Sequence, residues 1–332
     1  MKAFFIKQYG KRSGSIGELP EPKVGANDVM VQIKATSINP LDAKIRSGEF
    51  KQILPYTFPL ILGNDLAGVV VRVGPGVRQF KPGDEVYARP AQDRIGTFAE
   101  LISVDQDSLA LKPRNISMEQ AASLPLVALT AWQVLVETAQ LKKGQKVLIH
   151  AGSGGVGSVA IQLARHLGAF VATTTSTPNV EWVKALGADI VIDYKKQDFE
   201  TALNDYDVVV NSLDPVVLKK SVNCLKPGGL LVSISGPPPP EFGDAQGLSW
   251  PIKQILRLLS FRIRKISHAA GVKYSFVFMR ANGTQLKEIT SLVESGAIKP
   301  VIDKVYPFTS IADALTYVEQ GRVKGKVVIN LA

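Results

Sequence analysis

The fold is decided by the stretch Ala151-Gly152-Ser153-Gly154-Gly155-Val156-Gly157. Residues 152–157 match G-x-G-x-x-G, which is weak evidence alone and strong evidence between a buried strand and a helix. Here an apolar run at 146–151 precedes the glycines, and a helix is predicted over 156–167. The first glycine allows a tight turn, the second lets the backbone approach a pyrophosphate, and the third lets the helix pack on the strand. The stretch therefore predicts dinucleotide binding.

The segments after this turn alternate between strand and helix. Short β-branched and apolar runs predict strands at 170–175, 190–192, 208–210 and 230–234, and amphipathic stretches predict helices at 179–186 and 218–225. Alternation of this kind indicates an α/β fold, in which a doubly wound parallel sheet of the Rossmann type carries helices on both faces.

The first 124 residues differ, because short strands there are separated by glycine and proline turns. Many short strands of this kind predict a β-rich, barrel-like domain. Strands are expected at 29–35, 66–74, 274–278 and 327–329, and helices at 118–124 (capped by Ser117), 125–138 and 284–294. We therefore expect two domains, one formed by residues 1–124 with 270–332 and the other by residues 125–269.

Composition limits the classes of protein that fit. The 332 residues carry a net charge of +10, which indicates either a polyanionic partner or a solvated basic surface. No block of five like charges occurs and aromatic residues do not alternate with the basic ones, so we expect no nucleic-acid partner. Cys224 is the single cysteine, which excludes an intramolecular disulfide. No run is long and apolar enough for a signal peptide or a membrane span, so we expect a cytoplasmic protein without integral membrane association.

Residues 250–268 are both amphipathic and basic. Such a segment is typical either of a helix that lies on a membrane surface or of a helix that packs on its own protein. Its position in mid-chain, between structured units, favours packing.

The end of the second predicted strand bears on the choice of cofactor. Proteins that prefer NAD place an acidic residue there to bind the ribose 2′-hydroxyl. Here Ser176 and Thr177 follow the strand, and the first carboxylate is Glu181 in the next helix. We therefore predict NADPH, with Ser176 hydrogen-bonded to the 2′-phosphate.

The sequence offers few ligands for a catalytic metal. No cysteine precedes Cys224, and the three histidines are His150, His166 and His268. Catalytic zinc needs clustered Cys, His or carboxylate ligands. We expect no metal site, so hydride chemistry would proceed without a metal.

Several segments together resemble the quinone oxidoreductase branch of the zinc-free medium-chain dehydrogenase/reductases, over essentially the whole chain. They are Asn39–Gly48, Gly63–Gly68, Lys81–Val86, Leu186–Asp189 and Gly325–Val328. Zinc-containing relatives have a histidine ligand at the position of Asn64. The form Asn39-Pro40-Leu41-Asp42-Ala43-Lys44 is similar to the chloroplast-type enone reductases. The resemblance implies a GroES-like domain beside the Rossmann domain, and reduction by NADPH of the C=C bond of enones and enals, or of quinones.

The resemblance also implies roles for individual residues. Asn39 and Lys44 would lie beside the nicotinamide and the small-molecule substrate, where either would donate to the oxygen of a developing enolate. Many relatives have a tyrosine in place of Lys44, and many have a lysine in place of Pro178. The predicted cofactor site comprises Thr130, Gly152, Ser153, Gly154, Gly155, Val156, Gly157, Ser176, Tyr194, Leu213, Ser235, Phe276, Phe278 and Lys326.

Two alternatives stay open at this point. One is an enoyl-thioester reductase, and the other is a non-catalytic protein that binds NADPH or RNA. Relatives are often homodimers through the edge strand of the central sheet, so we expect a homodimer.

Overall fold

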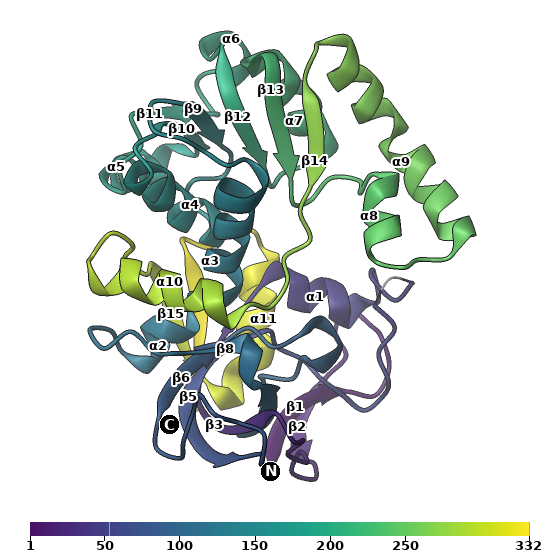
Figure 1. The fold of residues 1–332 in the computed structure, drawn as a ribbon, viewed down its shortest axis with the longest axis vertical. Coiled ribbons are helices and arrows are strands. Elements are labelled where there is room, and N and C mark those ends of the chain that lie inside the picture. Colours follow the sequence, from purple (N-terminus) through teal and green to yellow (C-terminus); the bar gives the residue numbers. More distant parts are fainter. Residues whose placement is uncertain (53, 332) are drawn as a thin grey trace. The chain divides into compact units, whose positions relative to one another are not determined.

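A computed structural model describes residues 1–52 and 54–331 (Figure 1). The chain divides into two compact units. Unit 1 comprises Met1–Leu129 with Arg280–Ala332, and unit 2 comprises Thr130–Met279. Each unit is described by itself below.

Unit 2 is built on a six-stranded parallel sheet with the order β11-β10-β9-β12-β13-β14. In chain order this is 3-2-1-4-5-6, the arrangement of two mononucleotide-binding halves. The strands are β9 (Lys146–Ile149), β10 (Phe170–Thr175), β11 (Ile190–Asp193), β12 (Tyr206–Asn211), β13 (Leu225–Ser233) and β14 (Lys273–Phe276). The strand order reverses between β9 and β12, and ligands of such sheets bind at the carboxyl ends of the strands at this point.

Helices lie on both faces of this sheet (Figure 1). The helices of this unit are α4 (Gly155–His166), α5 (Val180–Ala185), α6 (Phe199–Ala202), α7 (Pro215–Lys220), α8 (Pro240–Ala245) and α9 (Trp250–Ala269), of which α8 packs against α9. Because both faces are covered, the central strands are mostly apolar, as Leu148, Val209 and Leu231 illustrate in the core. The doubly wound sheet predicted from the sequence is confirmed.

Unit 1 contains a seven-stranded sheet, β15-β16-β3-β5-β6-β8 with β7 paired to β3, and a three-stranded sheet, β2-β1-β4. The strands are β1 (Lys2–Ile6), β2 (Ser15–Glu18), β3 (Asp28–Ile38), β4 (Leu60–Ile61), β5 (Asp65–Val73), β6 (Glu85–Ala88), β7 (Leu101–Asp105), β8 (Leu109–Leu111), β15 (Ile302–Pro307) and β16 (Lys326–Asn330). β3 lies at the centre, and a Cβ on Gly68 of β5 would lie 2.2 Å from the Gln32 carbonyl oxygen of β3. Only glycine permits this close approach of the two strands.

The helices of unit 1 include two that were not predicted from the sequence, α1 (Pro40–Ser47) and α11 (Ile311–Glu319). The others are α2 (Met118–Ala122) and α10 (Gly283–Glu294). α2 begins as predicted at Ser117, whose side chain and that of Gln120 accept each other's backbone N–H. α3 (Pro125–Trp132) continues as a π-helical segment, Gln133–Thr138, so the expected helix over 125–138 has two forms.

Candidate functional site

The glycine-rich turn of unit 2 has a shape that requires glycine at two positions, 152 and 157. Ala151 takes a left-handed conformation with φ +54°, and its carbonyl oxygen accepts the Gly154 N–H at 2.9 Å. A Cβ on Gly152 would lie 2.3 Å from Thr173 Oγ1, and a Cβ on Gly157 would lie 2.2 Å from the Ala151 carbonyl oxygen. Both contacts are too short for any side chain, so the glycines are required by the fold of the turn itself.

The amino terminus of α4 gives this turn its chemistry. The first N–H groups of a helix have no acceptor within the helix, and the helix dipole favours an anion beside them. In this helix the groups concerned belong to Gly155, Val156 and Gly157. Two buried side-chain atoms, Thr175 Oγ1 and Asn211 Nδ2, lie at the ends of β10 and β12, the strands on either side of β9. Neither atom has a hydrogen-bond partner within the described residues. The turn and these atoms fit a dinucleotide, whose phosphates α4 would hold.

A chain of hydrogen bonds from Ser221 through His150 and Thr174 fixes the backbone of the turn at Ala151. Ser221 Oγ donates to the Val217 carbonyl oxygen at 2.7 Å, so it accepts from His150 Nε2 at 2.9 Å. His150 Nδ1 then accepts from Thr174 Oγ1 at 3.1 Å, and Thr174 Oγ1 accepts the Ala151 N–H at 3.2 Å. Burial lowers the pKa of His150 to about 4, which keeps the ring neutral as this pattern requires. His150 therefore holds the strained Ala151 in place and is no metal ligand.

The predicted 2′-phosphate residues lie on two adjacent loops. Ser176 follows β10 and accepts from the Asn179 side chain at 3.1 Å, while Tyr194 follows β11 with 59% of its surface exposed. The structure adds a carboxylate that the sequence reading missed. Asp193 accepts from Thr177 Oγ1 at 2.7 Å, and this bond lowers the pKa of Asp193. Parallel pairing of β10 with β11 sets Asp193 beside Thr175, so the two strand ends could have been aligned from the sequence.

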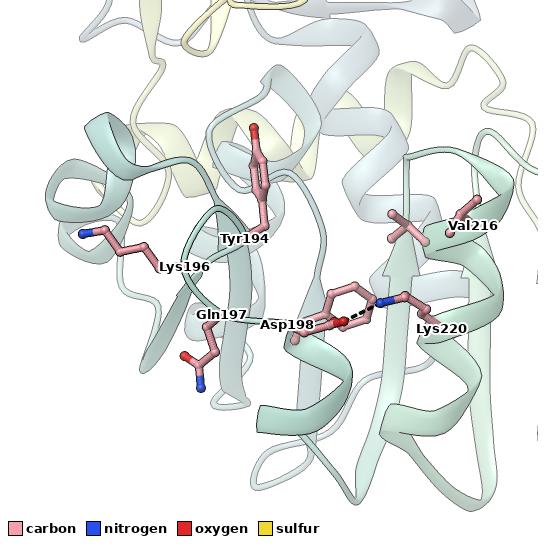
Figure 2. A pocket seen from close by; sticks show the side chains of 8 residues that line it. Tyr194, Lys196, Gln197, Asp198, Val216 and Lys220 are labelled. Atoms are coloured by element: carbon pink, nitrogen blue, oxygen red, sulfur yellow. Dashed lines mark hydrogen bonds and ion pairs between the residues drawn. The ribbon is translucent and has the colours of Figure 1, made fainter.

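A cavity of about 410 Å³ lies next to these loops (Figure 2). Tyr194 stands on one side of it, and the start of α7 lies on the other. Asp198 and Lys220 both line the cavity and form an ion pair with each other. The remaining lining residues are Lys196, Gln197, Phe199, Val216 and Val217.

Apart from Thr130, the other cofactor residues predicted in unit 2 lie at or just after the carboxyl ends of strands. Ser235 Oγ, after β13, donates to the Leu213 carbonyl oxygen, after β12, at 2.7 Å. The rings of Phe276 and Phe278 stack with their centroids 6.5 Å apart. Thr130, in the last turn of α3, is buried. The structure therefore brings Leu213 and Ser235 together at the edge where ligands of such sheets bind.

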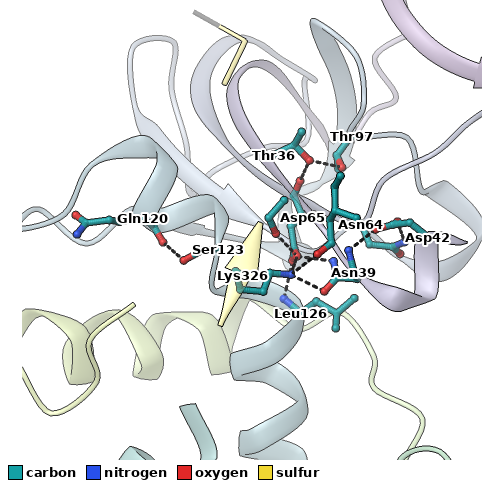
Figure 3. A network of polar contacts seen from close by, with 12 residues as sticks. Thr36, Asn39, Asp42, Asn64, Asp65, Thr97, Gln120, Ser123, Leu126 and Lys326 are labelled. Carbon is teal, nitrogen blue, oxygen red and sulfur yellow. Dashed lines mark hydrogen bonds and ion pairs between the residues drawn. The ribbon is translucent and has the colours of Figure 1, made fainter. Parts of the chain in front are cut away.

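Unit 1 holds a buried polar network centred on Asp65 (Figure 3). Its Oδ2 accepts from Ser37 Oγ and Asn39 Nδ2, both at 2.7 Å, and from Lys326 Nζ at 3.2 Å. Its Oδ1 accepts the Leu126 N–H, at the start of α3, at 2.7 Å. Asp65 thus joins β3, α1, β16 and α3.

The predicted catalytic residues differ in their surroundings. Asn39 is buried, and its Oδ1 accepts from Lys326 Nζ at 2.6 Å while its Nδ2 donates to Asp65. The Lys326 ammonium also donates to the Ile38 carbonyl oxygen, so its three protons are engaged inside unit 1. The side chain of Lys44, by contrast, is 45% exposed and lies 3.2 Å from Glu49. Of these three groups, Lys44 is the one accessible to a substrate.

A second part of the network surrounds Asn64 (Figure 3). Asn64 Nδ2 donates to Asp42 Oδ1 at 2.7 Å, and Asp42 Oδ2 accepts the Asn39 N–H at 2.7 Å. Burial raises the pKa of Asp42 to about 6, and burial lowers the pKa of Arg89 to about 10. Arg89 Nε has no hydrogen-bond partner within the described residues.

These residues do not fit zinc. The position that a histidine ligand would take holds the Asn64 amide, and the Asp65 carboxylate is already paired with an ammonium. Within residues 1–52 and 54–331, no three His, Cys, Asp or Glu side chains are grouped to hold a metal ion.

Two family models match parts of this chain. Residues 25–114 match the alcohol dehydrogenase GroES-like domain, and residues 186–329 match the family described as zinc-binding dehydrogenase. The NADPH-dependent alkenal/one oxidoreductase, chloroplastic, of Arabidopsis thaliana is 37% identical over 99% of this chain and 79% of its own length.

Two solved structures share the whole fold. The quinone oxidoreductase from Coxiella burnetii has a TM-score of 0.85 and 30% identity, covering 100% of this chain and 99% of its own. The Escherichia coli quinone oxidoreductase complexed with NADPH has a TM-score of 0.84 and 26% identity, covering all of both chains. The chain belongs to the quinone oxidoreductase branch of the medium-chain dehydrogenase/reductases.

Proposed function

We propose that this protein is an NADPH-dependent, zinc-independent reductase of the C=C bond of α,β-unsaturated carbonyl compounds or of quinones. The observation that carries the proposal is its likeness, over 99% of the chain, to an NADPH-dependent alkenal/one oxidoreductase. The glycine turn of unit 2 supports NADPH binding. The pairing of Asp65 with Lys326, and the Asn64 amide at the position of a histidine ligand, support chemistry without zinc.

The cofactor site that we propose lies along the carboxyl ends of the unit 2 strands. The amino terminus of α4 would bind the phosphates, Ser176 and Tyr194 would flank the 2′-phosphate, and Phe276 to Phe278 would meet the nicotinamide end. Thr130, Leu213 and Ser235 complete this set. Lys326 contributes from inside unit 1, because its ammonium orients Asn39.

Bound NADPH supplies the hydride, and the protein supplies orientation and charge. We propose that the Lys44 ammonium donates a hydrogen bond to the carbonyl oxygen of the substrate, on which negative charge develops. A fixed donor at that oxygen lowers the barrier because it needs no reorganisation during the reaction. Asn39, fixed by Asp65 and Lys326, would hold the start of α1 and so the position of Lys44. Water would then protonate the α-carbon.

The test measures loss of the reduced-nicotinamide absorbance of NADPH with 3-buten-2-one, 1,4-benzoquinone and crotonyl-CoA. Turnover of the enone or the quinone is expected. Turnover of crotonyl-CoA alone would favour the enoyl-thioester reductase, and no turnover together with salt-sensitive RNA binding would favour the non-catalytic alternative.

Lys44→Ala is expected to lower kcat for the enone roughly tenfold or more, since removal of one donor at an oxyanion has effects of this size or larger. Lys51→Ala, at another exposed lysine nearby, is the control and should leave kcat unchanged. Equal rates for both variants would remove Lys44 from the mechanism. The homodimer and the cytoplasmic location stay predictions, to be checked by light scattering and by imaging of a tagged protein.

A further inference from the structure

Helix α9 packs on unit 2 through one narrow stripe. Leu256, Ser260, Ile263 and Ser267 are buried, and they are spaced three or four residues apart as one helical face requires. Two of the four are serines, so the packed face is small. No helix among the described residues is long and apolar enough to cross a membrane, and this includes α9.

The opposite side of α9 is apolar along one flank. Ile255, Leu258 and Leu259 are 54%, 77% and 60% exposed. At about 100° per residue these three positions fall on one flank of the helix. Trp250, at the start of the helix, is 72% exposed. Single exposed apolar residues are ordinary, but a contiguous set on one helix marks a surface that another body covers.

Basic side chains share the rest of the exposed surface with Phe261, which is 57% exposed. At about 100° per residue, Arg257 lies on the flank opposite Ile255 and Leu259, Lys265 lies next to Leu258, and Arg262 lies between Ile255 and Leu258. α9 contains no Asp or Glu. Among residues 1–52 and 54–331, no acidic side chain forms an ion pair with any of these three charges. Lys253, nearer the packed face, does pair with Asp244 at 2.8 Å.

We propose that the exposed face of α9 docks on an anionic membrane surface. A helix of this type lies in the interface with its apolar side among the acyl chains and its Lys and Arg side chains at anionic headgroups. Trp250 suits the headgroup region, where tryptophan is enriched. The protein would then be peripheral, held on the surface without a spanning segment.

The charges favour lipid over a second copy of the chain. Two α9 faces packed against each other would bring together helices that carry only positive charge, with no carboxylate of α9 to offset the repulsion. The chain as a whole carries +10, which also attracts it to an anionic surface.

The experiment is sedimentation of the full chain with vesicles of phosphatidylcholine, alone or with one third phosphatidylglycerol. Binding to the anionic vesicles, weakened by salt, is expected, together with a blue shift of tryptophan fluorescence that Trp250→Phe removes. One basic residue near an anionic surface strengthens binding by about fivefold. Arg257→Gln/Arg262→Gln/Lys265→Gln should therefore weaken binding by roughly 100-fold.

The matched control is Lys142→Gln/Lys143→Gln/Lys184→Gln, which removes the same charge from exposed positions elsewhere on unit 2 and should keep most of the binding. Leu258→Gln/Leu259→Gln should abolish the fluorescence shift. Because all these side chains are exposed, the variants should fold, which circular dichroism checks. Equal loss of binding in the control variant would overturn the proposal. So would sedimentation velocity that shows a dimer of the wild type which Leu258→Gln/Leu259→Gln dissociates.

Discussion

The Asp65 carboxylate should be the most sensitive single group in unit 1. Four donors converge on it, from Ser37, Asn39, Leu126 and Lys326, and its side chain is fully buried. Asp65→Asn keeps the shape but removes the charge and turns one acceptor into a donor. The Lys326 ammonium, whose side chain is 6% exposed, would then be buried without its counter-ion.

Breaking one partner of a buried ion pair costs about 3–5 kcal/mol. For a unit of about 180 residues, each kcal/mol lowers Tm by about 2–4 °C. Asp65→Asn should therefore lower the unfolding temperature of unit 1 by roughly 6–20 °C in scanning calorimetry. The double variant Asp65→Asn/Lys326→Met removes both charges. Its loss of stability should therefore be smaller than the sum of the losses in the two single variants by about 1–3 kcal/mol.

The control is the exposed pair between Glu21 and Arg72, whose side chains are both 58% exposed. Glu21→Gln should cost less than about 1 kcal/mol. If Asp65→Asn unfolds as the control does, or if the Asp65 and Lys326 losses simply add, the buried pair does not hold the network together and our reasoning about unit 1 is refuted.

Three further predictions concern unit 2. Gly157→Ala should destabilise the turn and weaken NADPH binding more than tenfold by fluorescence titration, whereas Gly154→Ala, with its nearest contact at 3.3 Å, should fold normally; equal folding would contradict the steric argument. The pKa of His150 is lowered to about 4 in the folded protein, against about 6.5 in the unfolded chain. Neutral His150 therefore contributes about 3 kcal/mol to the free energy of unfolding above pH 6.5, and this contribution is lost as the pH falls toward 4. The stability of His150→Leu should therefore not fall in this way between pH 6.5 and 4, when unfolding is followed by tryptophan fluorescence. If the stabilities of His150→Leu and the wild type fall in parallel with pH, His150 is not the group that titrates. Asp193→Asn should raise the ratio of kcat/KM for NADPH over NADH, because it removes a negative charge beside the predicted 2′-phosphate site; an unchanged ratio would place that phosphate elsewhere.

Short-range sequence patterns predicted the helices and strands whose formation depends on neighbouring residues in the chain. The strand expected at 170–175 is β10, and the helix expected at 156–167 is α4 within one residue at each end. α1 was missed because its eight residues bury charged groups such as Asp42 and Arg46 and so lack an apolar stripe. The fold class and the cofactor followed from the glycine turn and the resemblance.

The spacing of residues along the sequence could not predict the polar network around Asp65. Asn39 and Lys326 are 287 residues apart in the chain, and only the pairing of β16 with β3 brings them together. The same holds for the role of His150. The sequence shows a histidine before the turn, but it does not show that Ser221, 71 residues further along the chain, fixes the tautomer of this histidine. Long-range strand pairing carries this information, and one sequence does not reveal it.

The hydrogen-bonded chain from Ser221 to Ala151 has a thermodynamic consequence. The backbone of the turn is already fixed before any ligand arrives, so a cofactor need not order it. The entropy of ordering that flexible phosphate loops lose on binding is, in this protein, lost when the chain folds. Affinity for the dinucleotide is therefore tied to the integrity of a buried imidazole that the ligand never touches.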